Sequence, residues 1–455
     1  MKFQSRIRFE AGSTHRIMPP EETAKRVEPF MRSIGVTRVA DTTGLDTIGM
    51  HVFSAIRPTD GDLHGISVYN GKGLTKADSR AGAMMEAIER YRAETWLGTV
   101  HRGTYQEMRA LHPESSVMDP ASMRLQRKKP HDSSVSLEWV DGWDLLNERP
   151  ALVAMNFVTC PYYGPEAGVF ESSSNGLASG NCLEEAVTHA LAELIERDAY
   201  TIAIVRSEVS DRFARMLEQV LAGADGPADP DGELLFPSVD LKTLPATVRN
   251  LVRMAERQGA EVVLRDMTSD IGIPTFIAFM RTRSADGTEF PAGGFGCDPN
   301  STIAAIRAIT EAAQSRNVAI QGVREDARAV KPLPEGGTLA LWRRDDGARA
   351  IPFQRVPTFQ NDDILDDLNL MLGRLKAVGV REAYAVDLSD PRVPANVARV
   401  IVPELEAWFL TGFSPESCRL GERASRYLTP QAAPTPAAPT TPTPAAPVRE
   451  FAHGA

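Results

Sequence analysis

The sequence contains 455 residues, of which 42% are hydrophobic and 24% are charged, and its net charge is −10 at pH 7. These proportions are those of an ordinary globular protein, and the acidic balance argues against general nucleic-acid binding through a basic surface. The four cysteines are widely spaced with no Cys-x-x-Cys pair, which argues against a zinc ribbon and against a disulfide framework.

The N-terminal segment, MKFQSRIRFEAGSTHRI, lacks the apolar stretch of a signal peptide. No apolar run in the sequence approaches the length needed to span a membrane. We therefore expect a cytoplasmic protein with reduced cysteines that binds neither a membrane nor nucleic acid.

The first unusual charge pattern lies in residues 67–90, SVYNGKGLTKADSRAGAMMEAIER. This stretch predicts an Asn-Gly loop, then small residues, then a helix that carries Glu-x-x-Glu-Arg. Glu86 and Glu89 are three residues apart, so their Cβ atoms would lie about 5–6 Å apart on one helix face. Met85 and Ile88 flank them, and charges on an apolar helix are costly unless something pairs with them.

Residues 172–197, SSSNGLASGNCLEEAVTHALAELIER, repeat the same arrangement. Glu193 and Glu196 have the spacing of the first pair. Two similar strand–loop–helix units predict two pseudo-symmetric halves, around 67–94 and 172–200, that face each other. Such an arrangement would direct four carboxylates into one space.

The segments that follow alternate between helical and strand patterns after an acidic, turn-rich loop at 224–232. The helix expected over 301–316 carries Arg307 and Glu311, but no Asn-Gly loop precedes it, so we do not interpret it as a third repeat. Helices packed on mixed sheets, an α+β fold, are the architecture this pattern predicts. The expected elements are helices at 244–259, 301–316 and 363–380 and strands at 260–268, 274–283 and 381–389.

Residues 429–455 are dominated by Pro, Ala and Thr. Such a composition cannot bury enough apolar surface to fold, so we expect a disordered or polyproline-like tail without a function of its own.

Four carboxylates in one space would repel one another unless cations lie between them. Oxygen ligands suit Mg²⁺, which typically takes one or two carboxylates together with substrate phosphates. Arg197 and Arg307 could hold phosphate oxygens, and Lys72 adds a positive charge. The residues therefore predict a nucleoside triphosphate held by metals between carboxylate helices, although the sequence has neither GxxxxGK[ST] nor GxGxxG.

A single Glu-x-x-Glu-Arg is more typical of a solvated helix face, and only its recurrence in matched units favours a functional role. His189, four residues before Glu193, is interpreted as a structural residue or a neighbour of the site. Cys297 is interpreted as a loop residue, because no histidine is placed beside it by the local sequence.

Taken together, the motifs NGKGLTKADSRAGAMMEAIERY, NGLASGNCLEEAVTHALAELIERDA and AAIRAITEAAQSR resemble the YcaO family, over roughly residues 35–410. The resemblance implies a YcaO-like fold of pseudo-symmetric mixed sheets packed with helices, with an ATP and Mg²⁺ site between carboxylate-bearing helices. It implies a catalytic domain over 1–428, followed by the tail.

The resemblance also implies a chemistry: ATP phosphorylates a backbone amide oxygen of a ribosomally made peptide, so that a nucleophile can attack the amide carbon. A sulfide source would give a thioamide, a side chain an azoline and an amine an amidine. No catalytic residue is assigned. By family likeness the metal ligands would be Glu86, Glu89, Glu193 and Glu196, and the residues that contact the nucleotide or complete the metal shell would be Asn181, Glu185, Arg197, Arg307 and Glu311.

The segments RVADTTGLD and GMHVFSAIRP look most like those of YcaO proteins that act with a TfuA partner in thioamidation. The expected partners are therefore a peptide substrate and a TfuA-like or other protein, with a homodimer left open. Two features depart from the family. Gly82 stands where relatives commonly have Ser, and the chain continues to VREFAHGA where azoline-forming relatives end in Pro-x-Pro-x-Pro.

Two further hypotheses remain open. The protein could be a non-catalytic nucleotide-binding accessory that assists a partner enzyme. A metal-carboxylate hydrolase unrelated to ATP would use the four glutamates but would leave Arg197 and Arg307 unexplained.

Overall fold

The computed structural model describes residues 1–9, 15–58, 66–96, 98–123, 131–167, 170, 172–220, 236–283, 289–322, 347 and 350–406, with side chains in α4 described as far as residue 203. The chain divides into two compact units, Met1–Arg419 and Leu420–Ala455. All described residues belong to the first unit. The predicted tail at 429–455 and the loop at 224–232 lie outside the described residues.

The N-terminal part is a three-stranded antiparallel sheet, in the order β1-β2-β3, on which α2 packs, with α1 packed against α2. The longer helix, α2, begins at a capping box in which the Thr75 side chain accepts from the Asp78 N–H and Asp78 accepts from the Thr75 N–H. Its Met84 and Ile88 side chains are fully buried in the core. The elements are α1 (Pro20–Val27), β1 (Arg38–Asp41), β2 (His51–Pro58), β3 (Ile66–Gly73) and α2 (Lys76–Thr95).

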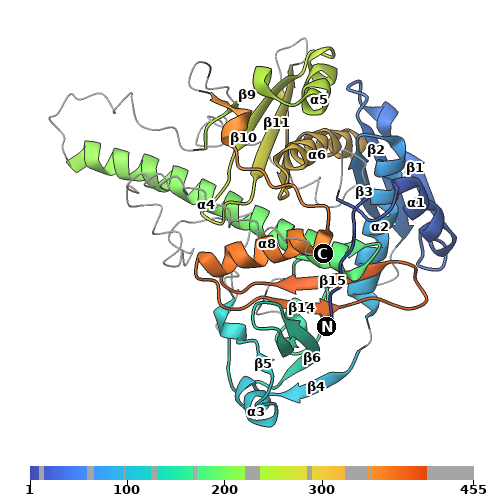
Figure 1. Cartoon of the computed structure of the whole chain (residues 1–455), viewed down its shortest axis with the longest axis vertical. Coiled ribbons are helices and arrows are strands. Elements are labelled where there is room, and N and C mark those ends of the chain that lie inside the picture. The colour runs from blue at the N-terminus through green and yellow to red at the C-terminus, as the bar shows by residue number, and fades with distance from the viewer. Residues whose placement is uncertain are drawn as a thin grey trace, which may run out of the picture. The chain divides into compact units, whose positions relative to one another are not determined.

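The central sheet has seven strands, in the order β5-β7-β6-β14-β15-β8, with β4 paired to β6. Its β5–β7 pair is parallel and the other pairs are antiparallel, so the sheet is mixed. Helices α4 and α8 pack together beside it (Figure 1). The elements are β4 (Val100–Gly103), α3 (Tyr105–Leu111), β5 (Ser116–Val117), β6 (Leu137–Asp144), β7 (Arg149–Ala154), η4 (Met155–Phe157), β8 (Leu177–Gly180), α4 (Leu183–Val220), α8 (Ile364–Ala377), β14 (Tyr384–Asp387) and β15 (Asn396–Ile401).

The third part is an antiparallel sheet, in the order β10-β11-β12, on which α6 packs with α5 alongside. Helix α6 begins at Asn300, whose side chain accepts from the Thr302 and Ile303 N–H groups, and ends at Gly322 in the left-handed conformation. The elements are α5 (Ala246–Glu256), β10 (Glu261–Asp266), β11 (Thr275–Arg283), β12 (Glu289–Cys297) and α6 (Ser301–Gln321), with a short parallel pair β9 (Val239–Asp240) and β13 (Ile351–Pro352).

The same strand-then-helix connection occurs in all three parts, as β3–α2, β8–α4 and β12–α6. In each, a strand glycine lies so close to the following helix that a Cβ would overlap the helix backbone or an adjoining side chain: Gly71 against α2, Gly180 against α4 and Gly294 against α6. Glycine is needed here because only it lets the two backbones approach. The interpretation that the third helix is not part of a repeat is therefore corrected: the feature that recurs is the strand glycine, not the Asn-Gly pair.

The three units contact one another in cyclic order. Helix α2 packs on β3 and also contacts β8; α4 packs on β8 and also contacts β12; α6 packs on β12 and also contacts β3. In Figure 1, α6 accordingly lies between β11 on one side and β2 and β3 on the other. This order brings the three helices together, with α4 contributing its N-terminal half.

The predicted α+β class and the positions of the predicted helices and strands are confirmed. One detail differs: Asn70 and Gly71 lie within β3 rather than in a loop, whereas Asn175 and Gly176 do form a turn before β8. No helix among the described residues is long and apolar enough to cross a membrane.

Candidate active site

Carboxylates from all three helices form a row where the helices meet. Burial raises the pKa of Glu89 well above its usual value, and the nearby Glu86 and Glu193 raise it further against Arg90. Burial likewise raises the pKa of Glu196 to about 7, with Glu311 and Glu193 adding to the effect against Arg197 and Arg307. The acids of α2 therefore neighbour those of α4, which in turn neighbour Glu311 on α6.

Hydrogen bonds from neighbouring strands and turns fix three of these carboxylates. Glu86 accepts from the Asn70 N–H (3.1 Å), and Glu193 accepts from the Gly176 N–H (3.0 Å). Glu89, on α2, accepts from the Ser179 hydroxyl on β8 (3.5 Å). The residues Asn70 and Gly176 belong to the two Asn-Gly pairs, so these pairs orient the glutamates of their own units.

Arg197 lies within the acid row. It forms ion pairs with Glu193 (3.5 Å) and Glu196 (3.6 Å), and its guanidinium lies over the Phe295 ring of β12, 5.4 Å from the centroid. Burial would lower the pKa of Arg197, but Glu196, Glu193 and Glu311 outweigh burial and raise it. Arg197 thus partly neutralises the acids and ties α4 to the third sheet.

Cations gather beside the row, around His189. Arg307 Nη2 lies 2.6 Å from His189 Nε2, and Arg16 Nη2 lies 3.3 Å from His189 Nδ1. Burial, followed by Arg307, Arg16 and Lys72, lowers the pKa of His189 well below its usual value, so the imidazole is neutral. A neutral imidazole has one acceptor nitrogen and one N–H, whereas an arginine can only donate. His189 can therefore accept a hydrogen bond from one of the two arginines but not from both. Such a concentration of donors and positive charge suits an anion such as a phosphate chain.

Lys72 and Glu311 join the first unit to the third. The Lys72 ammonium on β3 forms an ion pair with Glu311 on α6, and Glu311 also accepts from the Phe295 N–H (3.3 Å). Burial would raise the pKa of Glu311, but Lys72 and Arg197 outweigh burial and lower it.

Asn181 and Glu185 form a buried network at the start of α4. Glu185 accepts from the Asn181 N–H (2.7 Å) and from the Ile17 N–H (2.6 Å), while Arg16 approaches it at 3.5 Å. Asn181 accepts from the Thr23 hydroxyl (3.0 Å). The network therefore fixes the N-terminal segment that carries Arg16, and both predicted nucleotide contacts already bond to protein groups.

The donor set fits Mg²⁺ bound with phosphates better than a metal held by protein alone. Among the described residues, no three His, Cys, Asp or Glu side chains converge closely enough to hold a metal ion by themselves. Mg²⁺ usually takes only one or two carboxylates and completes its shell with phosphate oxygens and water. Burial first and neighbouring carboxylates second raise the pKa values of Glu89 and Glu196, and a cation held between these acids would favour their charged forms.

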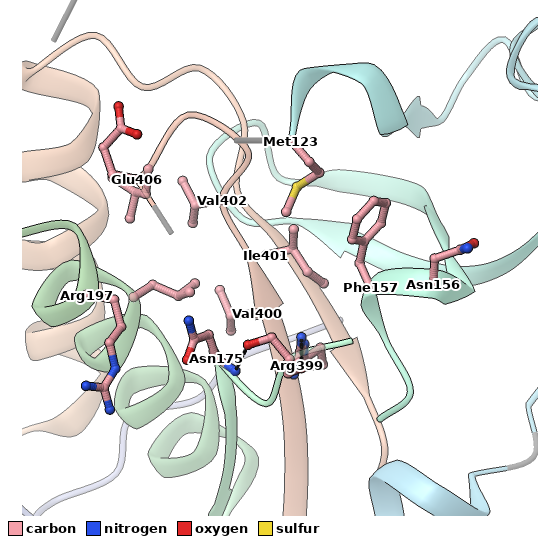
Figure 2. A pocket seen from close by; sticks show the side chains of 13 residues that line it. Met123, Asn156, Phe157, Asn175, Arg197, Arg399, Val400, Ile401, Val402 and Glu406 are labelled. Carbon is pink, nitrogen blue, oxygen red and sulfur yellow. Dashed lines mark hydrogen bonds between the residues drawn. The ribbon is translucent and has the colours of Figure 1, made fainter. Parts of the chain in front are cut away.

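A cavity of about 50 Å³ lies beside α4, and Arg197, which belongs to the acid row, also lines this cavity (Figure 2). Apolar side chains of β15 and its continuation, Val400, Ile401 and Val402, gather on one side of it. Figure 2 shows Met123 and Phe157 on another side, with Asn175 and Arg399 close together at its edge. The remaining lining residues are Asn156, Ser173, Leu194, Leu405 and Glu406.

Eight of the ten predicted site residues lie at the junction of the three units, whereas Asn181 and Glu185 lie in the network at the start of α4 that holds Arg16. Sequence reasoning missed three cations: Arg16, Arg90 and Arg399. Arg90 had a signal, because it is the arginine of the first Glu-x-x-Glu-Arg. Arg16 and Arg399 had none, because only tertiary packing brings them to the helices.

The chain is similar to several known proteins. The family model described as YcaO cyclodehydratase, ATP- and Mg²⁺-binding, matches residues 70–406. An uncharacterised protein of Methanothermobacter thermautotrophicus is 35% identical over 413 residues, which cover 89% of this chain and 97% of that protein. An uncharacterised protein encoded in the tfuA 3′ region of Rhizobium leguminosarum bv. trifolii is 32% identical over 423 residues, 90% of this chain and 92% of its own.

Among solved structures, that of YcaO from Methanopyrus kandleri, bound with AMPPCP and Mg²⁺, superposes with a TM-score of 0.65. It is 25% identical, and the match covers 89% of this chain and 95% of that one. The predicted YcaO-like fold is confirmed by this superposition.

Proposed function

The chain belongs to the YcaO family, and we propose that it uses ATP and Mg²⁺ to phosphorylate a backbone amide oxygen of a peptide, so that sulfide can replace that oxygen. The observation that carries the proposal is the row of carboxylates from three helices beside a cluster of cations around His189. Acids and cations side by side suit a metal-bound triphosphate, whose oxygens need both.

Different residues of the chain would bind the phosphates, offset the charge of the transferred group and hold the metal. Arg307, Arg16 and Lys72 would bind the phosphates, since they already converge on one neutral imidazole. Arg197 would offset charge that develops on the transferred phosphoryl group, because it is buried beside the acids. Glu86, Glu89, Glu193 and Glu196 would hold Mg²⁺, which when bound screens the charge of the phosphates.

An amide oxygen is a poor leaving group, whereas a phosphate is a good one. Phosphoryl transfer to the amide oxygen therefore prepares the carbon for attack, and the protein acts mainly by positioning. The finer part of the proposal, a thioamide product formed with a TfuA-like partner, is supported by the relative encoded in a tfuA region. Azoline or amidine formation would follow from the same activation with a different nucleophile.

A first experiment measures nucleotide binding. We expect ATP with Mg²⁺ to raise the melting temperature by a few degrees, and EDTA to remove the rise. Glu193→Ala should abolish the Mg²⁺-dependent part. The matched control is Glu184→Ala on the same helix, whose carboxylate accepts from the Gln4 N–H (2.8 Å). That variant should melt lower but keep the shift, and an unchanged shift in Glu193→Ala would remove Glu193 from the site.

A second experiment identifies the product. The peptides encoded beside this gene are co-expressed with the protein and its neighbours and weighed by mass spectrometry. Replacement of oxygen by sulfur adds about 16 Da, whereas cyclodehydration removes about 18 Da. Intact ATP binding without either shift would favour a non-catalytic accessory protein.

A further inference from the structure

The N-terminal segment is anchored at the starts of two helices. The Arg6 N–H donates to the Asp363 carboxylate (2.7 Å) at the start of α8, and Arg6 Nε donates to Glu184 (3.3 Å) at the start of α4. Further along, the Phe9 N–H donates to the Arg16 carbonyl (2.5 Å), which pairs two stretches of the segment. The backbone that carries Arg16 is therefore tied to the part of the segment that α4 and α8 hold.

His15 of the same segment lies against two aspartates from other parts of the chain. Its Nδ1 lies 3.0 Å from Asp367 Oδ2 on α8 and 3.3 Å from Asp298 Oδ1, in the connection between β12 and α6. The side chains of His15 and Asp367 are 7% and 1% exposed, and the other ring nitrogen, Nε2, lies 2.7 Å from Arg8 Nη1. Burial would lower the pKa of His15, but Asp298 and Asp367 outweigh burial and Arg8 and raise it. Polar groups from three parts of the chain therefore meet at one buried imidazole.

Arg16 is fixed on both sides by its neighbours in the chain. His15 precedes it, and the following residue, Ile17, donates its N–H to Glu185 (2.6 Å). The Arg16 side chain itself has longer contacts, 3.5 Å from Nη1 to Glu185 and 3.3 Å from Nη2 to His189 Nδ1. The shorter contacts of its two neighbours therefore contribute more to where the guanidinium lies. A guanidinium held in place before a ligand arrives loses less conformational entropy on binding, so fixing Arg16 should increase affinity.

The aspartate beside His15 also belongs to the start of α6. Asp298 accepts from the Asn300 N–H (2.9 Å), and Asn300 is the residue that caps α6. That helix carries Arg307, whose Nη2 lies 2.6 Å from His189 Nε2. The two arginines that flank His189 are thus connected by a second route, through His15 and Asp298.

We propose that His15 is a positioning residue, which holds the N-terminal segment on Asp298 and Asp367 so that Arg16 stays at the site of the ATP phosphates. The proposal rests on the proposed ATP binding and adds a residue that does not itself touch the nucleotide. The ordinary alternative is a buried histidine that only stabilises the fold. Under that alternative, loss of His15 would lower the melting temperature without acting through Arg16.

A double-mutant cycle tests whether His15 acts through Arg16. ATP affinity is measured by isothermal titration with Mg²⁺ for the wild type, His15→Leu, Arg16→Gln and the double variant. We expect each single change to weaken binding about tenfold, and the double variant to bind no more weakly than Arg16→Gln. Losses that add in the double variant would overturn the proposal, because His15 would then act independently of Arg16.

Two further histidine variants separate the polar anchor from general loosening. His15→Asn places an amide near the position of Nδ1 and should bind ATP within about threefold of the wild type, unlike His15→Leu. His131→Leu removes another buried histidine, whose Nδ1 lies 2.5 Å from Glu166, with side chains 6% and 8% exposed. That control should melt at a lower temperature with unchanged ATP affinity. Equal losses of affinity in His15→Leu and His131→Leu, or in His15→Asn and His15→Leu, would contradict the role of His15.

Asp367→Asn tests the contact from α8 and does not depend on the folding of a His15 variant. It keeps the shape of the side chain, whose Oδ1 accepts from Asn361 (3.0 Å), but removes the charge that faces His15. We expect ATP binding to weaken several-fold in the wild-type background and not at all in Arg16→Gln. An unchanged affinity in both backgrounds would overturn the proposal. Wild-type protein that binds no ATP would instead refute the proposed function, and the role of His15 with it.

Discussion

Lys72 on β3 and Glu311 on α6, 239 residues apart in the chain, form an ion pair at the junction of the three strand–helix units. A strand-to-helix contact also joins each of the other two pairs of units. Ser179 on β8 donates to Glu89 on α2, and Arg197 on α4 lies over Phe295 on β12. Each pair of units is therefore joined by a contact between a strand of one unit and the helix of the other, and the acid row lies where these contacts meet.

Replacing Lys72 by Met should weaken ATP binding about tenfold, because one cation near the proposed phosphate site is lost. The loss should also raise the pKa of Glu311, which Lys72 helps to hold down. Isothermal titration with ATP and Mg²⁺ measures the effect. The matched control is Lys76→Met, since Lys76 is 66% exposed and pairs with Asp41 on the surface. Equal affinities in the two variants would exclude Lys72 from the site.

Replacing Arg307 by Ala should reduce the ATP-induced rise in melting temperature by half or more. A charge-assisted hydrogen bond to phosphate contributes about 1.5–3 kcal/mol, and His189 would lose the neighbour that lies at 2.6 Å. Arg316→Ala is the control on the same helix, because Arg316 pairs with Asp46 (2.8 Å) instead. The control should melt at a lower temperature with its ATP response intact.

The raised pKa of Glu196 predicts that the stability of the metal-free protein depends on pH. Its folded-state pKa is about 7 against 4.5 for the free side chain, so the folded state binds the proton more tightly. The resulting stabilisation is complete below about pH 4.5 and is lost as the pH rises to about 7. We expect Glu196→Gln to match the wild type at low pH and to exceed it at pH 8 by up to about 3 kcal/mol.

Denaturant titrations in EDTA at several pH values between about 4.5 and 8 check this expectation. Glu256→Gln, on the exposed side of α5, should follow the wild-type curve. A wild-type protein that gains stability relative to Glu196→Gln as the pH rises would contradict the raised pKa.

The strand glycines predict a contrast between two alanine substitutions. Gly294→Ala should destabilise the protein by about 1–3 kcal/mol, because the new Cβ would overlap the backbone of Ala308 and Ala312. Gly373→Ala on α8 meets no atom within 4 Å and should stabilise by about 0.5–1 kcal/mol through helix propensity. Urea denaturation measures both, and a neutral Gly294→Ala would show that the strand and helix can separate without cost.

Local sequence was sufficient for several parts of the structure. The 3.6-residue periodicity and the Glu-x-x-Glu spacing predicted α2 and α4 and placed each glutamate pair on one face, because that spacing is a property of a single helix. The family resemblance extended the prediction to the fold, the nucleotide and the metal, because each of its motifs consists of residues within one unit.

The third repeat could not be found in this way. The predicted repeat was defined by Asn-Gly before each helix, whereas the recurring physical requirement is a glycine that lets strand and helix backbones meet. Gly294 and Gly296 meet that requirement in β12 without an asparagine.

Sequence alone determined the helices, the paired carboxylates and the absence of a nucleotide-binding loop of the known Gly-rich kinds. Only tertiary structure decided which cations meet those carboxylates. Arg16 reaches His189 across 173 residues, and Lys72 reaches Glu311 across 239. The physical reason is that spacing along one helix is set by local backbone geometry. Contacts between units depend instead on how three sheets and three helices share one buried junction.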